Sequence, residues 1–462
     1  MAIKPALPKG ARDFLPAEMR ERTYITEVIS RIFERYGYQR IETPALERNQ
    51  TLTGKYGEEG DRLIFKIAPR GQKLSSALQK VAEGQPEAWQ QATEEALRYD
   101  LTVPFARFVV QHQQELTFPF KRYQIQPVWR ADRPQKGRYR EFTQCDADAV
   151  GSDSLLLDLE LIAIYQEVFD ELGLPVAIRL NHRKVLAGLG ETLGLNEEEL
   201  GHFTMALDKL DKIGLAGVQK ELQERGLPET AARTLEELTA LDGSSAEKIQ
   251  GLLRLVGSSA IGQQGLQELN FLLEEARALD RHQCLQLDFT LARGLDYYTG
   301  TIMEVVPTEQ ALGSLGGGGR YDDLTSLFGK PGLSGIGISF GLDRIQLALR
   351  EARLFPAIEA IGTRVLFAHF GQREALYCLN LAQALRQLGV PTEVYPEAVK
   401  LKKQLQYAQK KYIPYVVLIG EEELKEGRFT LKNMEQGQQE ELSKIELLER
   451  FNPNAQTNHG KH

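Results

Sequence analysis

Hydrophobic and polar residues alternate with period two on both sides of a turn at residues 134–137. Before the turn, Tyr123, Ile125 and Trp129 alternate with arginines and glutamines, and after it small residues alternate with polar ones. Successive side chains of a strand point to opposite faces, so the pattern predicts a β-hairpin with one apolar or small face and one polar face. The polar face carries Arg122, Gln124, Gln126, Arg130, Phe142, Gln144, Asp146 and Asp148.

Other stretches show helical or short-strand patterns. Apolar residues recur at helical spacing over 17–36 and 153–173, and throughout residues 185–279, which predicts an all-helical insertion of low chemical content. Residues 335–345 predict a strand that runs into a helix, with Arg344 in the first turn of that helix. Residues 84–95 are polar and predict a surface loop or helix. Short strands are predicted over 38–44, 61–70, 97–104, 176–180, 286–291 and 301–306.

A domain boundary is predicted near residues 356–363, because the pattern of predicted elements changes beyond it. Strands and helices alternate beyond it, which predicts a small α/β domain with a mostly parallel sheet. The second helix of this domain carries Lys400, Lys402, Lys403, Lys410 and Lys411 with no acid among them. Such a run is either a solvated helix face or an RNA-facing patch.

Composition narrows the class of protein. The chain is 42% hydrophobic and 26% charged, with a net charge of −8, which disfavours general nucleic-acid binding but allows local basic patches. The three cysteines and seven histidines show no metal-ligand or disulfide spacing, which indicates a reducing compartment. The amino terminus lacks a signal-peptide core, and no apolar run approaches the length of a membrane span. We therefore expect a soluble cytoplasmic protein with no membrane association.

The polar face of the hairpin has two interpretations. It is either a solvated sheet surface or a pocket for a small zwitterion or nucleotide. Arginine forks suit phosphate, whereas carboxylates and amides suit an amino group. Cations bracket the turn and then give way to acids: Arg130, Arg133, Lys136, Arg138 and Arg140.

Four further segments carry candidate chemistry with an ordinary alternative beside each. Asp100 and Thr102 would share a strand face, where a turn or capping role is the simpler interpretation. Residues 292–300 form either a turn with aromatic packing or part of a site. The glycines of residues 312–322 match neither a P-loop nor a Rossmann motif and favour a flexible loop over a ligand cradle. Arg344 is either an anion-binding residue at a helix N-terminus or a surface arginine.

Taken in order, these segments resemble a class II aminoacyl-tRNA synthetase, and specifically the histidyl-tRNA synthetase family, along nearly the whole chain. Residues 38–47 look like the first class motif, 120–148 the second and 335–344 the third. Arg293-Gly-Leu-Asp-Tyr-Tyr298 and Gly317-Gly-Gly-Arg-Tyr-Asp322 are similar to the two signatures of the histidine enzymes, and the former is highly specific. The resemblance implies an antiparallel sheet flanked by helices, a helical insertion and an anticodon-binding domain with a mostly parallel sheet. The boundaries are 1–184 and 280–355 for the catalytic core, 185–279 for the insertion, 363–452 for the C-terminal domain and 453–462 for a disordered tail.

The resemblance also implies roles for individual residues. Arg130 would clamp the α-phosphate and the histidine carboxylate, Arg293 would hold the α-phosphate through transfer, and Arg344 would meet ATP near the γ-phosphate; these three are the implied catalytic residues. The ammonium group would meet Asp100, Thr102 and Gln144, and the imidazole would meet Asp148, Tyr298 and Tyr321, with Tyr297 beside them. Arg130 and Arg293 complete the implied histidine-binding set. The implied ATP site contains Asp132 and Phe142 together with Arg130 and Arg344. Arg133 and Gln135 match positions that contact the acceptor end of the tRNA.

Three positions depart from the bacterial pattern of this family. Asp100, Asp132 and Asp148 stand where glutamate is commoner, which keeps the charge but shortens its reach. The surroundings of Asp100 and Asp148 look like the eukaryote-type branch of the family.

The implied activity is ATP-dependent attachment of histidine to tRNA(His) by a cytoplasmic homodimer, through a histidyl-adenylate and with release of pyrophosphate. Mg²⁺ would bridge the ATP phosphates, largely through water and phosphate oxygens, and its protein ligands stay unassigned. One alternative is a non-catalytic, synthetase-like subunit that senses histidine and regulates histidine biosynthesis; such subunits usually lack the C-terminal domain. Another is a synthetase for proline or threonine, whose side chains have no use for the tyrosine pair and Asp148.

Overall fold

The structure is a computed structural model that describes residues 3–281, 283–292, 297–356 and 362–452. For residues 57–59 and 90 it describes the backbone alone. The chain divides into two compact units, Met1–Phe355 and Pro356–His462. The predicted disordered tail lies outside the described residues.

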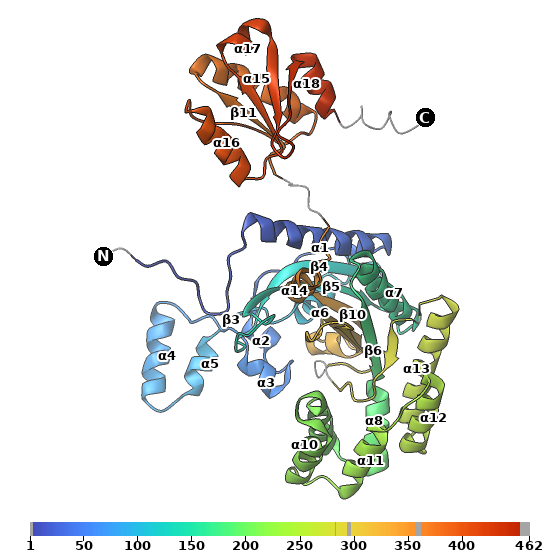
Figure 1. Ribbon diagram of the computed structural model, residues 1–462. Coiled ribbons are helices and arrows are strands. Elements are labelled where there is room, and N and C mark those ends of the chain that lie inside the picture. The colour runs from blue at the N-terminus through green and yellow to red at the C-terminus, as the bar shows by residue number, and fades with distance from the viewer. Residues whose placement is uncertain (1–2, 282, 293–296, 357–361, 453–462) are drawn as a thin grey trace. The chain divides into compact units, whose positions relative to one another are not determined.

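An eight-stranded sheet forms the centre of the first unit (Figure 1). Its inner strands pair antiparallel, and the edge pairs β1–β4 and β6–β7 are parallel, so the predicted antiparallel core is confirmed. In spatial order the strands are β1 (Gln39–Arg40), β4 (Phe120–Trp129), β5 (Glu141–Val150), β10 (Gly335–Gly341), β9 (Gly316–Tyr321), β8 (Thr301–Pro307), β6 (Val176–His182) and β7 (Leu285–Leu287).

Three helices cover one face of this sheet: α1 (Pro16–Arg35), α7 (Leu156–Glu171) and α14 (Leu342–Ala352) (Figure 1). The hydrophobic core lies between them and the sheet, and Cys145 and Ala147 of β5 belong to it. Phe340 of β10 packs there against Tyr165 and Phe169 of α7, at ring-centroid distances of 4.8 and 5.7 Å. Burying each such aromatic side chain stabilises the fold by about 1.5–3 kcal/mol. The odd-numbered residues of β5 therefore face the helices, and its even-numbered residues face the other side of the sheet.

Helices fill residues 183–278, as the sequence predicts. α8 and α13 approach so closely that a Cβ added to Gly188 would lie 2.4 Å from the Cα of Gly262. The helices are α8 (Arg183–Leu193), α9 (Glu197–Leu207), α10 (Leu210–Glu224), α11 (Glu229–Thr239), α12 (Ser245–Val256) and α13 (Ala260–Ala278).

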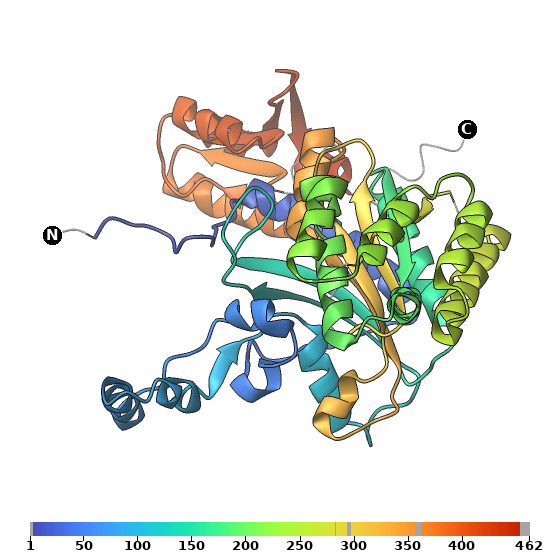
Figure 2. The same ribbon diagram turned by 90° about the horizontal axis from the view of Figure 1, so that it is seen from below.

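Between β1 and β4 the chain departs from the predicted strands. The strand expected over 61–70 is wrong, because α3 (Gly57–Arg62) occupies its start and the rest is irregular apart from a bridge between Lys66 and Ala96. The strand expected over 97–104 is also wrong: it ends at Leu97, so Asp100 and Thr102 share no strand face. The remaining elements here are β2 (Leu46–Arg48), α2 (Asn49–Leu52), α4 (Gln72–Ala82), α5 (Glu87–Ala92), β3 (Glu95–Leu97), α6 (Thr102–Gln111) and, later in the chain, the 3₁₀-helix η1 (Leu324–Phe328). Figure 2 shows α4 and α5 beside each other and apart from the large sheet.

The second unit contains a five-stranded sheet in the order β12-β11-β13-β14-β15. Strands β12, β11 and β13 are parallel, but β14 and β15 are antiparallel, so the prediction of a mostly parallel sheet holds only for the first three strands. The six-residue helix between β13 and β14 is too short for the crossover that a parallel return requires. The elements are β11 (Val365–His369), α15 (Gln372–Gln387), β12 (Thr392–Val394), α16 (Leu401–Lys410), β13 (Tyr415–Ile419), α17 (Glu421–Glu426), β14 (Arg428–Asn433), β15 (Gln439–Ser443) and α18 (Lys444–Phe451). Among all described residues of the chain, no helix has the length and apolar character needed to cross a membrane.

Candidate active site

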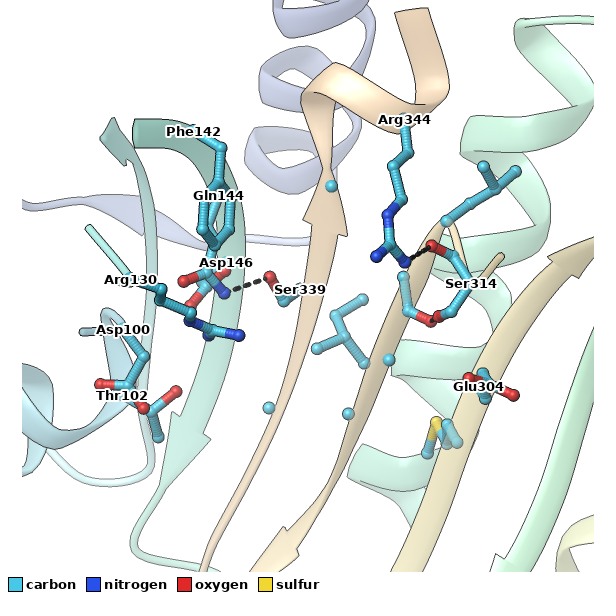
Figure 3. A pocket seen from close by; sticks show the side chains of 18 of the residues that line it. Asp100, Thr102, Arg130, Phe142, Gln144, Asp146, Glu304, Ser314, Ser339 and Arg344 are labelled. Carbon is cyan, nitrogen blue, oxygen red and sulfur yellow. Dashed lines mark hydrogen bonds between the residues drawn. The ribbon is translucent and has the colours of Figure 1, made fainter. Parts of the chain in front are cut away.

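A cavity of about 340 Å³ lies on the face of the large sheet that points away from α1, α7 and α14. The even-numbered residues of β5 form part of its wall, together with β8, β9 and β10 (Figure 3). The polar face of the hairpin is thus a pocket, and its interpretation as a solvated surface is wrong. Eleven residues singled out from the sequence line this cavity: Asp100, Thr102, Arg130, Asp132, Phe142, Gln144, Asp148, Tyr297, Tyr298, Tyr321 and Arg344.

Glycines of β9 and β10 allow close packing in the wall of the cavity. The run expected to be a flexible loop is instead strand β9, in the middle of the sheet. A Cβ added to Gly318 would lie 2.2 Å from the carbonyl oxygen of Gly337, and one added to Gly337 would lie 2.0 Å from Oδ1 of Asp148. These positions exclude side chains, so close packing rather than flexibility explains the glycines.

Two arginines from distant parts of the sequence project into the cavity (Figure 3). Arg130 follows β4; its Nε donates to the Tyr99 carbonyl at 3.1 Å, and its guanidinium carbon lies 5.2 Å from the centre of the Phe142 ring. Arg344 is in the first turn of α14, as predicted, and donates to the carbonyls of Gly137 and Ser314 at 3.1 and 2.7 Å. Backbone acceptors therefore hold both cations in place, which rules out an ordinary surface arginine at position 344.

A buried ionic cluster surrounds Asp148 at another part of the cavity. Arg122 Nη2 lies 2.6 Å from Asp148 Oδ2, and the Tyr321 hydroxyl donates to Asp148 Oδ1 at 2.6 Å. Asp148 is 1% exposed and Arg122 is fully buried. Burial raises the pKa of Asp148, and the charge of Arg122 opposes that rise. The cluster combines a carboxylate, a guanidinium and a phenol in a site with almost no solvent.

A second buried carboxylate, Asp100, lies at the start of α6. Its Oδ1 accepts from the Tyr56 hydroxyl at 2.9 Å and from the Val103 amide at 3.2 Å, which agrees with the predicted capping role. Burial raises the pKa of Asp100. Next to it, Thr102 hydrogen-bonds the Tyr297 side chain. The structure therefore joins the Asp100 segment to the tyrosine pair.

The tyrosines form a wall of the cavity. The ring centre of Tyr297 lies 5.0 Å from that of Tyr298 and 6.0 Å from that of Tyr321, in edge-to-face geometry. Burial raises the pKa of all three phenols, so they stay protonated and can donate hydrogen bonds at neutral pH. This arrangement suits an aromatic ligand with polar ring atoms.

The residues after the turn are held by α14. Asp343 forms ion pairs with Arg12 and Arg22 and accepts from the Thr143 amide at 3.1 Å. Thr143 lies between Phe142 and Gln144, so this contact positions both cavity residues. Asp132 is buried nearby, with its Oδ2 3.6 Å from Arg138 Nε.

Three predicted residues lie elsewhere. Arg133 and Gln135 are exposed in the hairpin turn, outside the cavity lining. Gln135 exchanges backbone hydrogen bonds with Arg138 there, at 2.9 and 3.1 Å. Arg293 falls outside the described residues.

Sequence reasoning assigned no role to four residues at the site. Asp146, Glu304 and Ser339 line the cavity, and Arg122 pairs with Asp148. The period-two pattern between Gln144 and Asp148 was the available signal for Asp146. The other three depend on strand pairing, which the sequence pattern does not determine.

Comparison with known proteins places the chain among relatives of one family. Residues 10–78 and 89–345 match a family model described as histidyl-tRNA synthetase, and residues 364–453 match an anticodon binding domain. A histidine–tRNA ligase of Christiangramia forsetii is 53% identical over 448 residues, covering 96% of this chain and 98% of the relative. One of Flavobacterium johnsoniae is 51% identical over 462 residues, covering 95% and 97%.

Solved structures show the same fold. The crystal structure of histidyl-tRNA synthetase from Nostoc sp. PCC 7120 has a TM-score of 0.80 at 31% identity and covers 97% of this chain and 99% of its own. A Bacillus halodurans protein described as an ATP phosphoribosyltransferase regulatory subunit/histidyl-tRNA synthetase has a TM-score of 0.72 at 22% identity, covering 91% of this chain and 100% of its own. At that identity the second likeness concerns the fold alone.

Proposed function

The chain belongs to the histidyl-tRNA synthetase family, and from this premise we propose how its residues carry out the reaction. It is a class II aminoacyl-tRNA synthetase that uses ATP to attach histidine to tRNA. One observation supports the assignment of this chemistry to the cavity: Arg130 and Arg344 share it with the buried cluster of Asp148 and Tyr321. The cavity thus offers guanidinium groups for phosphate and a polar recess for imidazole.

In the first step, a carboxylate oxygen of histidine attacks the α-phosphorus of ATP, a new P–O bond forms, and the bond to the leaving pyrophosphate breaks. Such a transfer needs positioned reactants and stabilised charge rather than a covalent nucleophile on the protein. We assign the α-phosphate and the histidine carboxylate to Arg130, the γ-phosphate region to Arg344, and the adenine ring to Phe142. We assign Arg293 to the α-phosphate by its place in the family signature, and Asp132 to the ATP site.

We assign the amino acid to the part of the cavity between the even-numbered residues of β5, which form its floor, and the tyrosine wall. The ammonium group would meet Asp100, Thr102 and Gln144, and the imidazole would meet Asp148, Tyr298 and Tyr321, with Tyr297 beside it. Buried polar groups discriminate strongly between amino acids, because a substrate that lacks the matching atoms leaves these groups without hydrogen-bond partners. The ion pair of Asp148 with Arg122 favours the ionised carboxylate in this recess.

We propose that Mg²⁺ accompanies ATP. Mg²⁺ prefers oxygen ligands and usually keeps several waters while it bridges phosphates. Glu304, a carboxylate that lines the cavity beyond the predicted set, is a protein oxygen donor whose chemistry fits such an ion. Among the described residues no group of three or more His, Cys, Asp or Glu side chains is arranged to hold a metal, so ATP would supply most of the non-water ligands.

In the second step, a hydroxyl of the 3′-terminal ribose attacks the carbonyl carbon of the adenylate, and AMP leaves. We propose Arg133 and Gln135 as contacts to the acceptor end of tRNA(His), since both are exposed in the turn next to the cavity residues. The match of residues 364–453 to an anticodon binding domain supports the C-terminal unit as the second tRNA contact.

We further propose a homodimer that acts in the cytoplasm. The proposal of a dimer interface rests on the likeness of residues 38–47 to the first class motif, where Leu46 is 48% exposed. The three cysteines lie far apart in the sequence, without the paired spacing of a disulfide framework, which supports a reducing compartment. Sedimentation velocity tests the dimer.

The boundaries 1–184, 185–279, 280–355 and 363–452 remain our proposed domain limits.

The histidine-sensing regulatory subunit is less well supported. The near-full-length relatives are described as histidine–tRNA ligases, and the chain has the C-terminal unit that such subunits usually lack.

ATP–pyrophosphate exchange with each amino acid in turn tests the proposed chemistry. We expect exchange with histidine alone. In Arg293→Ala we expect loss of exchange while histidine binding, measured by calorimetry, persists. Histidine binding without exchange in the wild type would favour the sensor, and wild-type exchange in Arg293→Ala would remove that residue from the mechanism.

A further inference from the structure

Asp146 lies between the two residues to which we assign opposite ends of histidine. Gln144, Asp146 and Asp148 occupy successive positions on the cavity side of β5, each about 7 Å from the next along the strand. The Asp146 side chain is 2% exposed and lines the cavity next to Gln144 (Figure 3). A ligand that spans from Gln144 to Asp148 must pass over it.

The carboxylate of Asp146 has an oxygen without a partner. Its side chain hydrogen-bonds the hydroxyl of Ser339, which lies opposite it on β10 and also accepts from Gln144 Nε2 at 2.9 Å. Oδ1 of Asp146 is buried and has no hydrogen-bond partner. A buried acceptor in this state costs free energy that a bound donor would recover.

The neighbouring Asp148 is placed differently. Tyr321 occupies one of its carboxylate oxygens and Arg122 faces the other, each at 2.6 Å. Oδ2 of Asp148 also makes no hydrogen bond, but its ion pair with Arg122 offsets its charge, whereas Oδ1 of Asp146 has neither a hydrogen bond nor an ion pair among the described residues.

We propose that Asp146 is an additional histidine-binding residue, whose open Oδ1 accepts a hydrogen bond from the ammonium group of the bound amino acid. Gln144 and Ser339 form one hydrogen-bonded group with Asp146 and hold it toward that cation. Asp148 then acts on the imidazole chiefly by fixing the Tyr321 hydroxyl. This inference rests on the proposed function and adds a residue to its substrate site.

The surroundings of Asp146 make the proposed contact sensitive to pH. Burial raises its pKa to about 7, against the opposing charge of Arg122 on β4 and with the added repulsion of Asp148 on β5 and of Asp100. Ser339 on β10 favours the ionised form. Ammonium binding would favour the ionised form further, so the pKa of Asp146 falls on binding. The contribution of Asp146 to affinity is then complete above the pKa of the free enzyme and declines as the pH falls through about 7.

The test compares Asp146→Asn with the wild type by calorimetry at pH 8 and pH 6. The probes are histidine and imidazole-lactic acid, which carries a hydroxyl in place of the amino group. We expect the Kd of histidine at pH 8 to rise about 10- to 100-fold in the variant, as for loss of a hydrogen bond between charged groups. The Kd values of ATP and imidazole-lactic acid should stay within about threefold of wild type, which is less than the change expected for histidine. The variant should also lose the Asp146-dependent weakening of histidine binding at pH 6.

Other results would overturn the proposal. An unchanged Kd of histidine removes Asp146 from the site, and equal losses for both probes would mean that it serves the imidazole or only the local structure. Ser339→Ala, which leaves the carboxylate in place, is the matched control and should weaken histidine binding far less than Asp146→Asn. If Asp146→Asn does not fold, Asp146→Ser serves in its place, with the same expected outcomes. Absence of histidine-dependent pyrophosphate exchange in the wild type would be a separate failure, of the proposed function itself.

Discussion

In the eight-stranded sheet, β5 buries Gln144, Asp146 and Asp148 on one face, whereas the central strands of the five-stranded sheet bury Phe367 and Val417. Both faces of β11 are apolar: Val365 and Phe367 belong to one cluster and Leu366 and Ala368 to another. The first sheet has its largest apolar core on its helix-covered face, whereas its other face carries the polar side chains of the cavity beside a smaller apolar cluster that includes Phe120 and Val150. The two sheets of the chain therefore differ in what they bury: apolar side chains cover both faces of β11, whereas the first sheet buries polar side chains on one face.

The difference shows what a binding site costs in stability. Apolar burial stabilises a fold without any need for partners, but each buried charge needs a counter-charge or hydrogen bonds to offset its desolvation. Arg122 and Tyr321 meet that need for Asp148, whereas Oδ1 of Asp146 is left open. The polar floor is therefore less stable than an apolar one, and this open capacity is what a substrate can use.

The largest expected effect comes from Arg122→Ala, which leaves the buried Asp148 without its cation. We expect a loss of about 3–5 kcal/mol in the free energy of unfolding of the first unit, together with loss of exchange activity. Urea denaturation followed by tryptophan fluorescence measures it, because both tryptophans, Trp89 and Trp129, lie in that unit.

A double-mutant cycle of Arg122→Met, Asp148→Asn and the double variant Arg122→Met/Asp148→Asn is the control for this change. The double variant removes both charges, so its loss of stability should be smaller than the sum of the single losses. Additive losses would mean that the ion pair does not couple the two residues, and the contrast between the two sheets would lose its main support.

A loss of similar size, but confined to the other sheet, is expected from Phe367→Ala. Truncating this fully buried ring should destabilise the C-terminal unit by about 3–5 kcal/mol. Hydrogen exchange of β11 and β13 amides measures it. ATP–pyrophosphate exchange should stay within about twofold of wild type, a change of under 0.5 kcal/mol, because all the described residues that line the cavity belong to the first unit. Loss of ATP–pyrophosphate exchange in this variant would contradict our inference, because it would show that the activity of the first unit depends on the stability of the C-terminal unit.

The smallest effect is expected from Lys402→Ala combined with Lys403→Ala on α16. Both side chains are exposed, and Lys403 lies 3.5 Å from its acidic neighbour Glu397, so stability should change by less than about 0.5 kcal/mol. If this face meets RNA, tRNA binding should weaken, and the slope of log K against log salt should fall by about 1 for each phosphate that the variant no longer neutralises. Lys425→Ala, an exposed lysine on α17 of the same unit, is the matched control. Equal tRNA affinity and equal salt slope in both variants would assign α16 to a solvated surface.

Local patterns predicted much of the fold because they reflect local physics. The alternation around residues 134–137 predicted β4, β5 and the face of each residue, and helical spacing predicted α1, α7 and the helices of residues 183–278. The predictions failed where neighbours in space override local preference. The glycines of β9 form a strand because they pair with β10 on one side and β8 on the other, and the carbonyls of those strands leave no room for larger side chains. Thr102 starts a helix rather than continuing a strand, with Asp100 accepting from the Val103 amide.

The sequence by itself determined which residue types the site contains and on which face of β5 they lie, because a period of two needs only neighbours along the chain. It also determined the family, through signatures whose residues are contiguous in the sequence. Only the tertiary structure decided that Arg122 pairs with Asp148, that Arg344 meets the turn at Gly137, and that Asp146 keeps an open oxygen. The reason is physical: which charges are paired once water is excluded depends on strand register and on the packing of α14, and both arise from contacts between residues far apart in the chain.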